Sequence, residues 1–271
     1  MNKIESTEKQ YLDLVRNILD NGEDKQTRNG MTRSQFGAQI RITELKDGKL
    51  PLLTSRKHFL KGITAEYAAF LKGPKSVADF EEEGCNYWKL WADNEAGDLR
   101  VDYGNAWINF NGVNQIDYVI NLLRTDPNSR RMIINAWDPV HVINNELSLE
   151  CCHYSYQFHV SEGTYLNLKF IQRSVDTLIG MPSDFILASL MVLTFAKSSG
   201  LLPGEIIMDF TDVHIYSEHI EDAWKQLDQE TFEFPTFTDN GLTSDIYSFN
   251  KEKIQVHNYK HSNSIKYLLK A

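Results

Sequence analysis

The chain has 271 residues, of which 42% are apolar and 24% charged, a balance that excludes an intrinsically disordered protein. Its formal net charge of −9 argues against a general nucleic-acid-binding or anionic-membrane surface, although a compact basic pocket for a small anion is compatible with it. The three cysteines, two of them adjacent, indicate a reducing compartment rather than a disulfide framework. The N-terminus lacks the apolar core of a signal peptide, and no run approaches ~18 apolar residues. We therefore expect a soluble, unprocessed cytoplasmic protein with no membrane partner.

The first half of the chain alternates helical patterns with turns. Helices are predicted over residues 11–19, 63–71 and 116–123, closed by Asn21-Gly22, Gly73-Pro74 and Asp126-Pro127 respectively. The polar segment 23–37 is predicted to be a loop or turn that leads into a strand over 38–45. Trp88 and Trp91 are three residues apart, so both can lie on one side of a helix.

From Arg131 onward the pattern is that of strands with a buried face. Strands are predicted for the apolar-rich, partly alternating stretches RMIINAW, CHYSYQFHV, YLNLKFIQ and EIIMDFTDVHIY. Residues 185–196 are too long and too uniformly apolar for a strand, and we predict a buried helix there. The tail, 231–271, has the pattern of short strands and turns. Because no repeat or clear linker interrupts the chain, we predict one mixed α+β domain over residues 1–271.

A candidate nucleophile lies at the head of one predicted strand, where Cys151 and Cys152 precede His153. A deprotonated sulfur attacks well, and nearby cations lower the pKa of a thiol. Cysteines are also among the most buried residue types, so a packed pair is the more common explanation of such a motif. A zinc site is a third alternative, but adjacent thiols lack the usual chelate spacing and the chain has no second cysteine pair.

Charged residues supply further candidates. Arg130 and Arg131 follow a turn, DPNS, and suit a phosphate dianion because a guanidinium keeps its charge and offers a rigid donor fork. Arg173 could add a third guanidinium, and the alternative for the pair is a solvated surface. Glu66 lies in an otherwise apolar helical segment, TAEYAAFL, where it either faces solvent or is a buried acid–base group with a raised pKa.

Aromatic and histidine side chains remain ambiguous from the residues alone. Three aromatic residues are more often core than cofactor platform: Trp88, Trp91 and Tyr103. His214 and Tyr216 could be donors at a strand end or satisfied polar core residues.

Together, these residues resemble thymidylate synthase over nearly the whole chain, from TRNGMTRSQFG to SIKYLLKA. The shared stretches follow the family's order and near-family spacing: LPLLTSRK, the Glu66 helix, YWKLWADNEAGDL, DYGNAW, DPNSRRMIINAWDP, CCHYSYQF, QRSVDTLIGMPSD and DVHIYSEHIE. The resemblance implies a mixed six-stranded sheet wrapped by helices and a homodimer packed sheet to sheet. It also implies a small nucleotide substrate and 5,10-methylenetetrahydrofolate as the cosubstrate, with no metal.

The resemblance also assigns roles by position. Cys152 matches the nucleophile that adds to C6 of a pyrimidine nucleotide. The network that moves protons and orders water is matched by Glu66, Tyr103 and His153. The nucleotide site is matched by Arg28, Gln172, Arg173, Ser174, His214 and Tyr216, with Arg130 and Arg131 reaching the phosphate from the other subunit. The methylenetetrahydrofolate site is matched by Trp88, Trp91 and Asp176, and the tail that ends at Ala271 is expected to close over it.

Asp184 is the most informative departure from the family pattern. Where thymidylate synthases have Pro-Phe-Asn, this chain has Pro182, Ser183 and Asp184. The family's Asn reads O4 and N3–H of uracil, whereas cytosine presents an amino donor at C4 and an acceptor at N3. An Asp can accept from the amino group, and it can hold or share the proton that N3 gains once Cys152 has added to C6. Family members with Asp here resemble the phage deoxycytidylate hydroxymethylases.

Other departures are Cys151 for a proline, Phe59 for a basic residue and Ser183 for a folate-side phenylalanine. The loss of folate-side groups is consistent with a cosubstrate that delivers its carbon without then being oxidised by hydride transfer. We therefore expect an enzyme that hydroxymethylates dCMP. Its catalytic residues are expected to be Cys152, Glu66 and Asp184, aided by His153 and Tyr103. The alternatives are hydroxymethylation of CMP, methyl transfer to dUMP or dCMP, and, in a different class, an inactive nucleotide- or RNA-binding protein.

Overall fold

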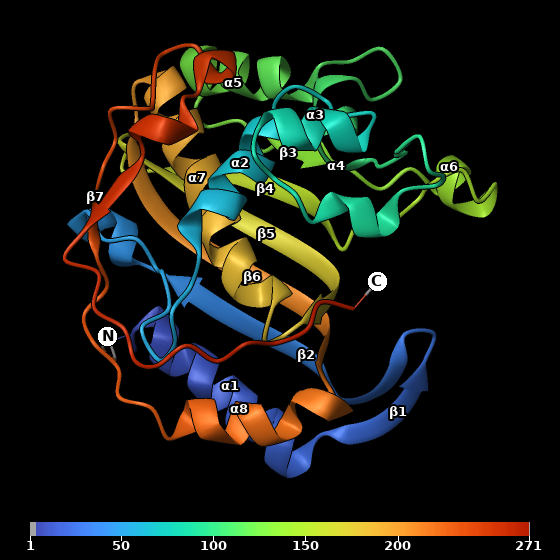
Figure 1. The fold of residues 1–271 in the computed structure, drawn as a ribbon. Coiled ribbons are helices and arrows are strands. Elements are labelled where there is room, and N and C mark those ends of the chain that lie inside the picture. Colours follow the sequence, from blue (N-terminus) through green and yellow to red (C-terminus); the bar gives the residue numbers. More distant parts are fainter. Residues whose placement is uncertain (1–3, 271) are drawn as a thin grey trace.

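The computed structural model describes residues 4–270, in which a mixed sheet is covered by helices (Figure 1). In spatial order the strands are β1 (Glu23–Thr27), β2 (Gly30–Ile42), β6 (Leu202–Tyr216), β5 (Tyr165–Asp176), β4 (His153–Ser161) and β3 (Ile133–Asn135). β5 and β6 run parallel, and all other neighbours run antiparallel. The predicted α+β class and mixed six-stranded sheet are confirmed.

The central helix, α7 (Gly180–Ser199), crosses the sheet and connects the parallel strands β5 and β6 (Figure 1). It is apolar almost all round, and residues such as Phe185, Leu190 and Phe195 are fully buried. Burial of each such side chain contributes roughly 1.5–3 kcal/mol. Gly200 ends the helix in the left-handed conformation, with φ of 76°. The prediction of a buried helix at this place is confirmed.

The other helices surround α7 or flank the sheet. They are α1 (Thr7–Asn21), α2 (Leu60–Phe70), α3 (Val77–Glu82), α4 (Tyr103–Ile108), α5 (Gln115–Thr125), α6 (Pro139–Ile143) and α8 (Ile220–Leu227). The three helices predicted in the first half coincide with α1, α2 and α5 to within a few residues. No helix within residues 4–270 combines the length and apolar character that crossing a membrane requires.

The polar segment 23–37 forms a β-hairpin and the start of β2, so its prediction as a loop is wrong. β1 pairs with β2 up to Thr27 opposite Gly30, whose φ of 127° closes the turn. Arg33 Nε donates to Asp24 Oδ1 of the facing strand at 2.8 Å. Backbone hydrogen bonds between the two strands and side-chain contacts across them stabilise this segment, and its side chains are mostly exposed. No alternation of apolar residues therefore marks it in the sequence.

Short elements complete the chain. Trp88 and Trp91 lie on a 3-10 helix, η2 (Trp88–Trp91), rather than on an α-helix. Their ring centroids are nevertheless 5.3 Å apart. The tail has the predicted short strands and turns, in the order η4 (Ile246–Ser248), η5 (Lys251–Lys253) and β8 (Gln255–His257), with β8 paired to β7 (Thr236–Thr238). The remaining 3-10 turns are η1 (Glu44–Asp47) and η3 (Ser217–His219).

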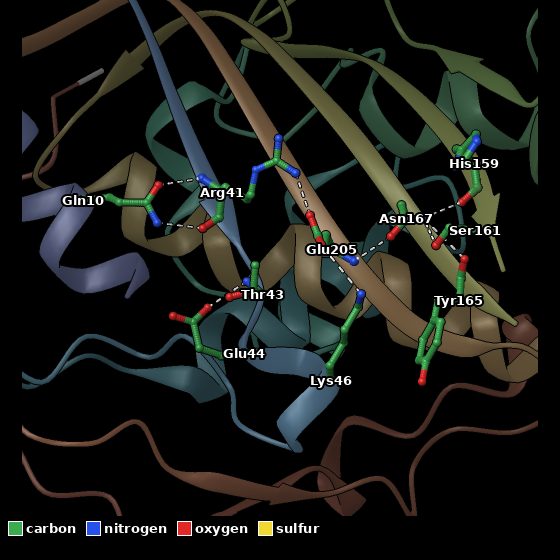
Figure 2. A network of polar contacts seen from close by, with 10 residues as sticks. All are labelled: Gln10, Arg41, Thr43, Glu44, Lys46, His159, Ser161, Tyr165, Asn167 and Glu205. Atoms are coloured by element: carbon green, nitrogen blue, oxygen red, sulfur yellow. Dashed lines mark hydrogen bonds and ion pairs between the residues drawn. The ribbon is translucent and has the colours of Figure 1, made fainter. Parts of the chain in front are cut away.

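The sheet face turned away from α7 is polar, and a network of contacts ties its strands together (Figure 2). Glu205 of β6 accepts from Arg41 of β2 at 2.6 Å and lies 3.7 Å from Lys46 of η1. Asn167 of β5 accepts from the backbone N–H of Glu205 at 2.9 Å and donates to the Ser161 hydroxyl at 2.9 Å. This face is therefore an ordered polar surface.

Candidate active site

The two adjacent thiols at the start of β4 have different surroundings. Cys151 is 1% exposed and its thiol donates to the Ala136 carbonyl at 3.5 Å. Burial raises the pKa of Cys151 to about 12, so it remains a thiol. Burial also raises the pKa of Cys152, but the Arg173 guanidinium opposes that rise. Cys152 is half-buried, and of the two it is the thiol able to act as a nucleophile.

Arg173 on β5 is fixed against the segment that carries the nucleophile. Its Nε donates to the Cys151 carbonyl at 2.9 Å and its Nη2 to the Glu150 carbonyl at 3.0 Å. Its backbone N–H donates to the Cys152 carbonyl at 2.9 Å. The guanidinium also lies over the Trp137 ring, 5.5 Å from the centroid. A fixed positive charge thus stands beside the thiol, with further N–H groups able to bind an anion.

Tyr103 and His153 lie on the core side of the nucleophile. The Tyr103 hydroxyl, at the start of α4, accepts from the Cys152 backbone N–H at 2.8 Å. His153 is 5% exposed, its ring centroid is 4.5 Å from that of Tyr103, and its Nδ1 shares a hydrogen bond with the Tyr156 hydroxyl. Burial lowers the pKa of His153 to about 3, so the imidazole is neutral. The cation that favours the thiolate is therefore Arg173, not His153.

Glu66 on α2 is half-buried, and its carboxyl is bound to the Trp88 indole. Its Oε1 accepts from Trp88 Nε1 at 2.8 Å. Burial raises the pKa of Glu66 to about 7, although the donors Trp88 and Tyr87 act in the opposite direction. A carboxyl with a pKa near neutrality can both give and take a proton, as acid–base catalysis requires.

Asp184 lies in the second turn of α7 and is paired with Gln172 of β5. Its Oδ2 accepts from Gln172 Nε2 at 2.8 Å. Burial raises the pKa of Asp184 to about 8, and the charge of Glu66 adds to the rise. Gln172 is fully buried, and its Oε1 has no hydrogen-bond partner among residues 4–270. At neutral pH this pair therefore offers one carboxyl proton and one free acceptor.

Three elements far apart in the sequence bring the thiol and the two carboxyls together. The charge of Glu66 on α2 raises the pKa of Asp184 on α7, and Asp184 in turn raises the pKa of Cys152 before β4. A proton taken up by one of them consequently changes the charge that the other two experience.

The carboxyl ends of the parallel strands β5 and β6 gather further polar groups. His214 and Tyr216 of β6 meet edge to face, with ring centroids 5.4 Å apart. Asp212 fixes the His214 ring through an Nδ1–Oδ1 contact of 2.8 Å. Asp176 of β5 pairs with His214 in the sheet and accepts from two backbone N–H groups that follow it, at 2.9 and 3.1 Å. Ligands of open sheets commonly bind at this end of parallel strands.

The remaining candidates lie on other segments of the chain. Arg28 is exposed in the β1–β2 turn and its Nε donates to Asn29 Oδ1 at 3.3 Å. Arg130 and Arg131 are exposed on the segment before β3, while Ser174 is half-buried on β5 beside Arg173. Ala271 lies outside the described residues.

The two tryptophans of η2 differ in what they offer. Trp88 is buried and stacks on Phe80, with centroids 4.5 Å apart, and its indole N–H is used by Glu66. Trp91 is half-buried and packs against Trp88 at the edge of the core. Of the pair, Trp91 therefore has the more accessible ring.

Three aromatic residues near the site were not predicted from the sequence: Trp137, Tyr156 and Tyr87. Trp137 ends the NAW stretch just after β3, and an aromatic residue beside an arginine-rich turn is the signal that could have found it. Tyr156 reaches His153 because β4 is irregular between His153 and Ser155, which no sequence pattern reveals. Tyr87 lies beside Gly62 of α2 because the segment that carries η2 packs on that helix.

The family model of thymidylate synthase matches residues 9–271, which is nearly the whole chain. The match spans every strand of the sheet and all the residues assembled around Cys152. The resemblance drawn from the motifs is therefore confirmed. The chain belongs to the thymidylate synthase family, whose members transfer a one-carbon unit from methylenetetrahydrofolate to C5 of a pyrimidine nucleotide.

Proposed function

We propose that this family member hydroxymethylates a cytosine nucleotide, converting dCMP to 5-hydroxymethyl-dCMP with 5,10-methylenetetrahydrofolate and water. The observation that carries the proposal is the half-buried Asp184 carboxyl, held by Gln172 where the family has an asparagine. A pKa of about 8 means that Asp184 keeps a proton at neutral pH. It can donate this proton towards N3 of cytosine and accept from the amino group at C4.

The charge that develops during the reaction favours cytosine over uracil at this site. Addition of Cys152 to C6 pushes electron density towards N3 and the C4 substituent. In cytosine, a proton supplied to N3 by Asp184 neutralises that charge. In uracil N3 already carries a proton, so the proton that Asp184 holds cannot be delivered there.

The steps follow from the groups around the thiol. The Cys152 thiolate, stabilised by Arg173, forms a bond to C6 and makes C5 a nucleophile. When bound, methylenetetrahydrofolate supplies the electrophilic one-carbon unit that C5 attacks. The C5 proton is then lost, the bond between the transferred carbon and the folate nitrogen breaks, and tetrahydrofolate leaves, so that an exocyclic methylene remains on the nucleotide. Water adds its oxygen to this carbon, electrons return to the ring, and the bond between C6 and Cys152 breaks.

Glu66 is the group that we assign to the water. Its pKa of about 7 lets it accept a proton as the water oxygen attacks and return it in another step. Its electrostatic contact with Asp184 supports its location beside the base. His153 is neutral and bonded to Tyr156, so its contribution is to hold Tyr103 and the nucleophile segment in place.

Residues in the chain fit a folate cosubstrate. The half-buried Trp91 ring offers an apolar surface, and Asp176 offers carboxylate oxygen to ring N–H donors. Asp176 is half-buried, and burial raises the pKa of its carboxyl. The tail that ends at Ala271 is expected to cover this side of the site.

A sheet-to-sheet homodimer completes the proposed nucleotide site. Arg28, Arg173 and Ser174 would bind the phosphate within one subunit, and Arg130 and Arg131 would reach it from the other. The exposure of both arginines and the ordered polar face of the sheet support this arrangement. The three free cysteines support a reducing, cytoplasmic setting.

Tritium release from C5-labelled dCMP, CMP and dUMP in the presence of methylenetetrahydrofolate tests the proposal. We expect release from dCMP and a product that carries one oxygen more than a methylated nucleotide by mass. Asp184→Asn should transfer the preference to dUMP, because an amide pairs with O4 and N3–H. It should also remove a fall in rate above pH ~8, where wild-type Asp184 loses the proton that N3 requires.

Two variants control this experiment. Asp117→Asn, on the exposed side of α5, should leave the substrate preference unchanged. Cys152→Ala should abolish release from every nucleotide, because no nucleophilic C5 can form. An unchanged cytosine preference in Asp184→Asn would refute the base-reading role, and release by Cys152→Ala would refute the covalent scheme.

A further inference from the structure

The C-terminal segment, residues 262–270, is attached to the rest of the molecule by contacts that the steps above do not use (red in Figure 1). At its start, the Ser262 backbone N–H donates to the Thr54 carbonyl at 2.8 Å, and the Ser262 hydroxyl donates to the Glu230 carbonyl at 2.8 Å. Residues 263, 264 and 266 are then exposed. A second group of contacts lies near the end of the segment, at residues 267–270.

Tyr267 is the first residue of this second group. Its hydroxyl lies 2.9 Å from Gln226 Oε1 and 3.2 Å from the Asp222 carbonyl oxygen, both on α8. Gln226 is 1% exposed, and its Nε2 donates to the Ser55 hydroxyl at 3.0 Å, so the acceptor is itself fixed. The Arg56 guanidinium lies over the Tyr267 ring, 5.3 Å from its centroid. The Tyr267 ring is thus held at its hydroxyl and on its face.

His219 binds the backbone of the residue that follows. It ends η3, is the N-cap residue of α8 and is 4% exposed. Its Nε2 accepts from the Leu268 backbone N–H at 3.3 Å. A ring nitrogen that accepts carries no proton, so the imidazole is neutral with its proton on Nδ1, which has no hydrogen-bond partner among residues 4–270. The one acceptor of this buried imidazole is therefore used by the C-terminal segment.

The His219 ring also contacts one aromatic ring of the C-terminal segment and one of β6. Its centroid is 5.3 Å from that of Tyr267 and 6.1 Å from that of Tyr216, and both contacts are edge to face. Lys270 forms an ion pair with Glu218, the neighbour of His219, but both side chains are partly exposed, so this pair adds little. The buried attachment of residues 267–270 is therefore centred on His219, at the end of β6.

We propose that His219 is a positioning residue for the C-terminal segment: its Nε2 and its ring hold Tyr267 and Leu268 against the end of β6. The proposal rests on the proposed function in one respect, the expectation that this segment covers the methylenetetrahydrofolate side of the site. His219 touches no reacting atom. A segment that is not attached must be ordered when the cosubstrate binds, and that entropic cost weakens binding. Loss of the attachment should therefore affect the cosubstrate and not the nucleotide.

Trypsin cleavage after Lys266 in the free enzyme measures the attachment directly. Lys266 is exposed, and its cleavage requires the flanking residues to leave the body of the protein. His219→Leu removes the acceptor but keeps an apolar side chain in the buried position. We expect it to release the terminal peptide about fivefold faster by mass spectrometry, as loss of one hydrogen bond predicts.

Two further variants separate the acceptor from the bulk of the ring. His219→Gln places an amide oxygen at about the reach of Nε2, so it should return the cleavage rate to within about twofold of wild type. His257→Leu, at the exposed end of β8, is the matched histidine control and should leave the rate unchanged. Cleavage of His219→Leu at the wild-type rate would overturn the proposal, as would equally fast cleavage of His219→Gln.

Leu268→Pro removes the same hydrogen bond from the other side. Leu268 is 63% exposed, so this change deletes the N–H donor without disturbing the core. KM for methylenetetrahydrofolate should rise about fivefold in Leu268→Pro and in His219→Leu, and no further in the double variant, because both remove one shared contact. The turnover number and KM for the nucleotide should stay within about twofold. Multiplication of the two effects in the double variant would contradict the shared hydrogen bond.

The two readouts distinguish this proposal from the proposed function. The cleavage is measured without substrate, so it depends only on how the C-terminal segment is held. Faster cleavage of His219→Leu in an enzyme that does not turn over dCMP would support the attachment and refute the proposed function. Faster cleavage with an unchanged KM for methylenetetrahydrofolate would overturn the link between His219 and the cosubstrate.

Discussion

Arg173 is bound on several sides before any nucleotide arrives. Two carbonyls of the nucleophile segment accept from its guanidinium, and the Trp137 ring lies beneath it. Such a side chain loses little rotamer freedom when it binds an anion, because packing and hydrogen bonds have already ordered it. Its charge also offsets part of the burial that disfavours the Cys152 thiolate. One residue thus prepares both the nucleophile and the anion site.

Arg173→Gln should therefore make Cys152 harder to deprotonate. Without the guanidinium, burial alone acts on the thiol, so the pKa of Cys152 should rise further, by roughly 0.5–1 unit. The midpoint of the alkylation rate of the free enzyme against pH measures this shift. Arg124→Gln, which removes a guanidinium bonded to the Ser198 carbonyl, is the control and should leave the midpoint in place. A midpoint that does not move in Arg173→Gln would mean that another group supports the thiolate.

Asp184 and Glu66 illustrate how similar side chains receive different tasks. Both are half-buried, yet the pKa of Asp184 rises to about 8 with one amide donor, while the pKa of Glu66, which accepts from the Trp88 indole, rises only to about 7. Asp184, the more basic carboxyl, is better suited to keep a proton for N3. Glu66, the less basic carboxyl, is better suited to accept a proton from water at neutral pH.

At the scale of elements, α6 is joined to the helix start at Tyr103 by a polar contact of His141. The helix has five residues, none of them buried, and it projects at the edge of the molecule (Figure 1). His141 connects it to Asp102, with Nδ1 and Oδ1 2.9 Å apart, and Asp102 is buried beside Tyr103. Asp102 raises the pKa of His141, while burial raises the pKa of Asp102 despite this partner. Asp138 and Glu146 also face the imidazole and act in the same direction.

The stability that His141 contributes should depend on pH. Its folded pKa lies above the unfolded value of ~6.5, so the contribution is complete below that pH and is lost as the pH rises through the folded pKa. His141→Ala should therefore cost more at pH 6 than at pH 8, by less than about 1 kcal/mol because the side chain is 43% exposed. Urea unfolding at both pH values measures the difference, with the exposed His257→Ala as the control. A cost that does not change with pH would show that the contact is not an ion pair.

Elements with a strong apolar signature could be predicted from the sequence, and polar ones could not. α7 was predicted because residues such as Leu190 and Phe195 are apolar on every side of the helix. The hairpin of β1 and β2 was missed because its strands are stabilised by ladder hydrogen bonds and by contacts such as Arg33–Asp24. In the site, motifs pointed to Cys152, whereas Tyr87 was missed because its contact depends on how η2 packs on α2.

At the scale of the whole molecule, the proposed dimer would make each site depend on both chains. The polar sheet face pairs its charges internally: Lys169 with Asp209 at 2.6 Å, and Arg41 with Glu205 at 2.6 Å. Charges that are already paired can be buried between subunits at lower cost than isolated ones. Arg130 and Arg131, in contrast, are exposed next to β3 and are available to a second chain.

Mixing two inactive variants should restore activity if the arginines act across the dimer. One variant is Cys152→Ala, and the other carries Arg130→Gln with Arg131→Gln. In a heterodimer, one site combines an intact Cys152 with arginines from the partner, while the other site lacks both. Random reassociation makes half of the dimers mixed, so activity should recover to about a quarter of wild type, as measured by tritium release from C5-labelled dCMP. Arg124→Gln in place of the arginine pair is the control and should be active before mixing. Absence of recovery, with subunit exchange verified by mass, would show that the arginines act within their own chain.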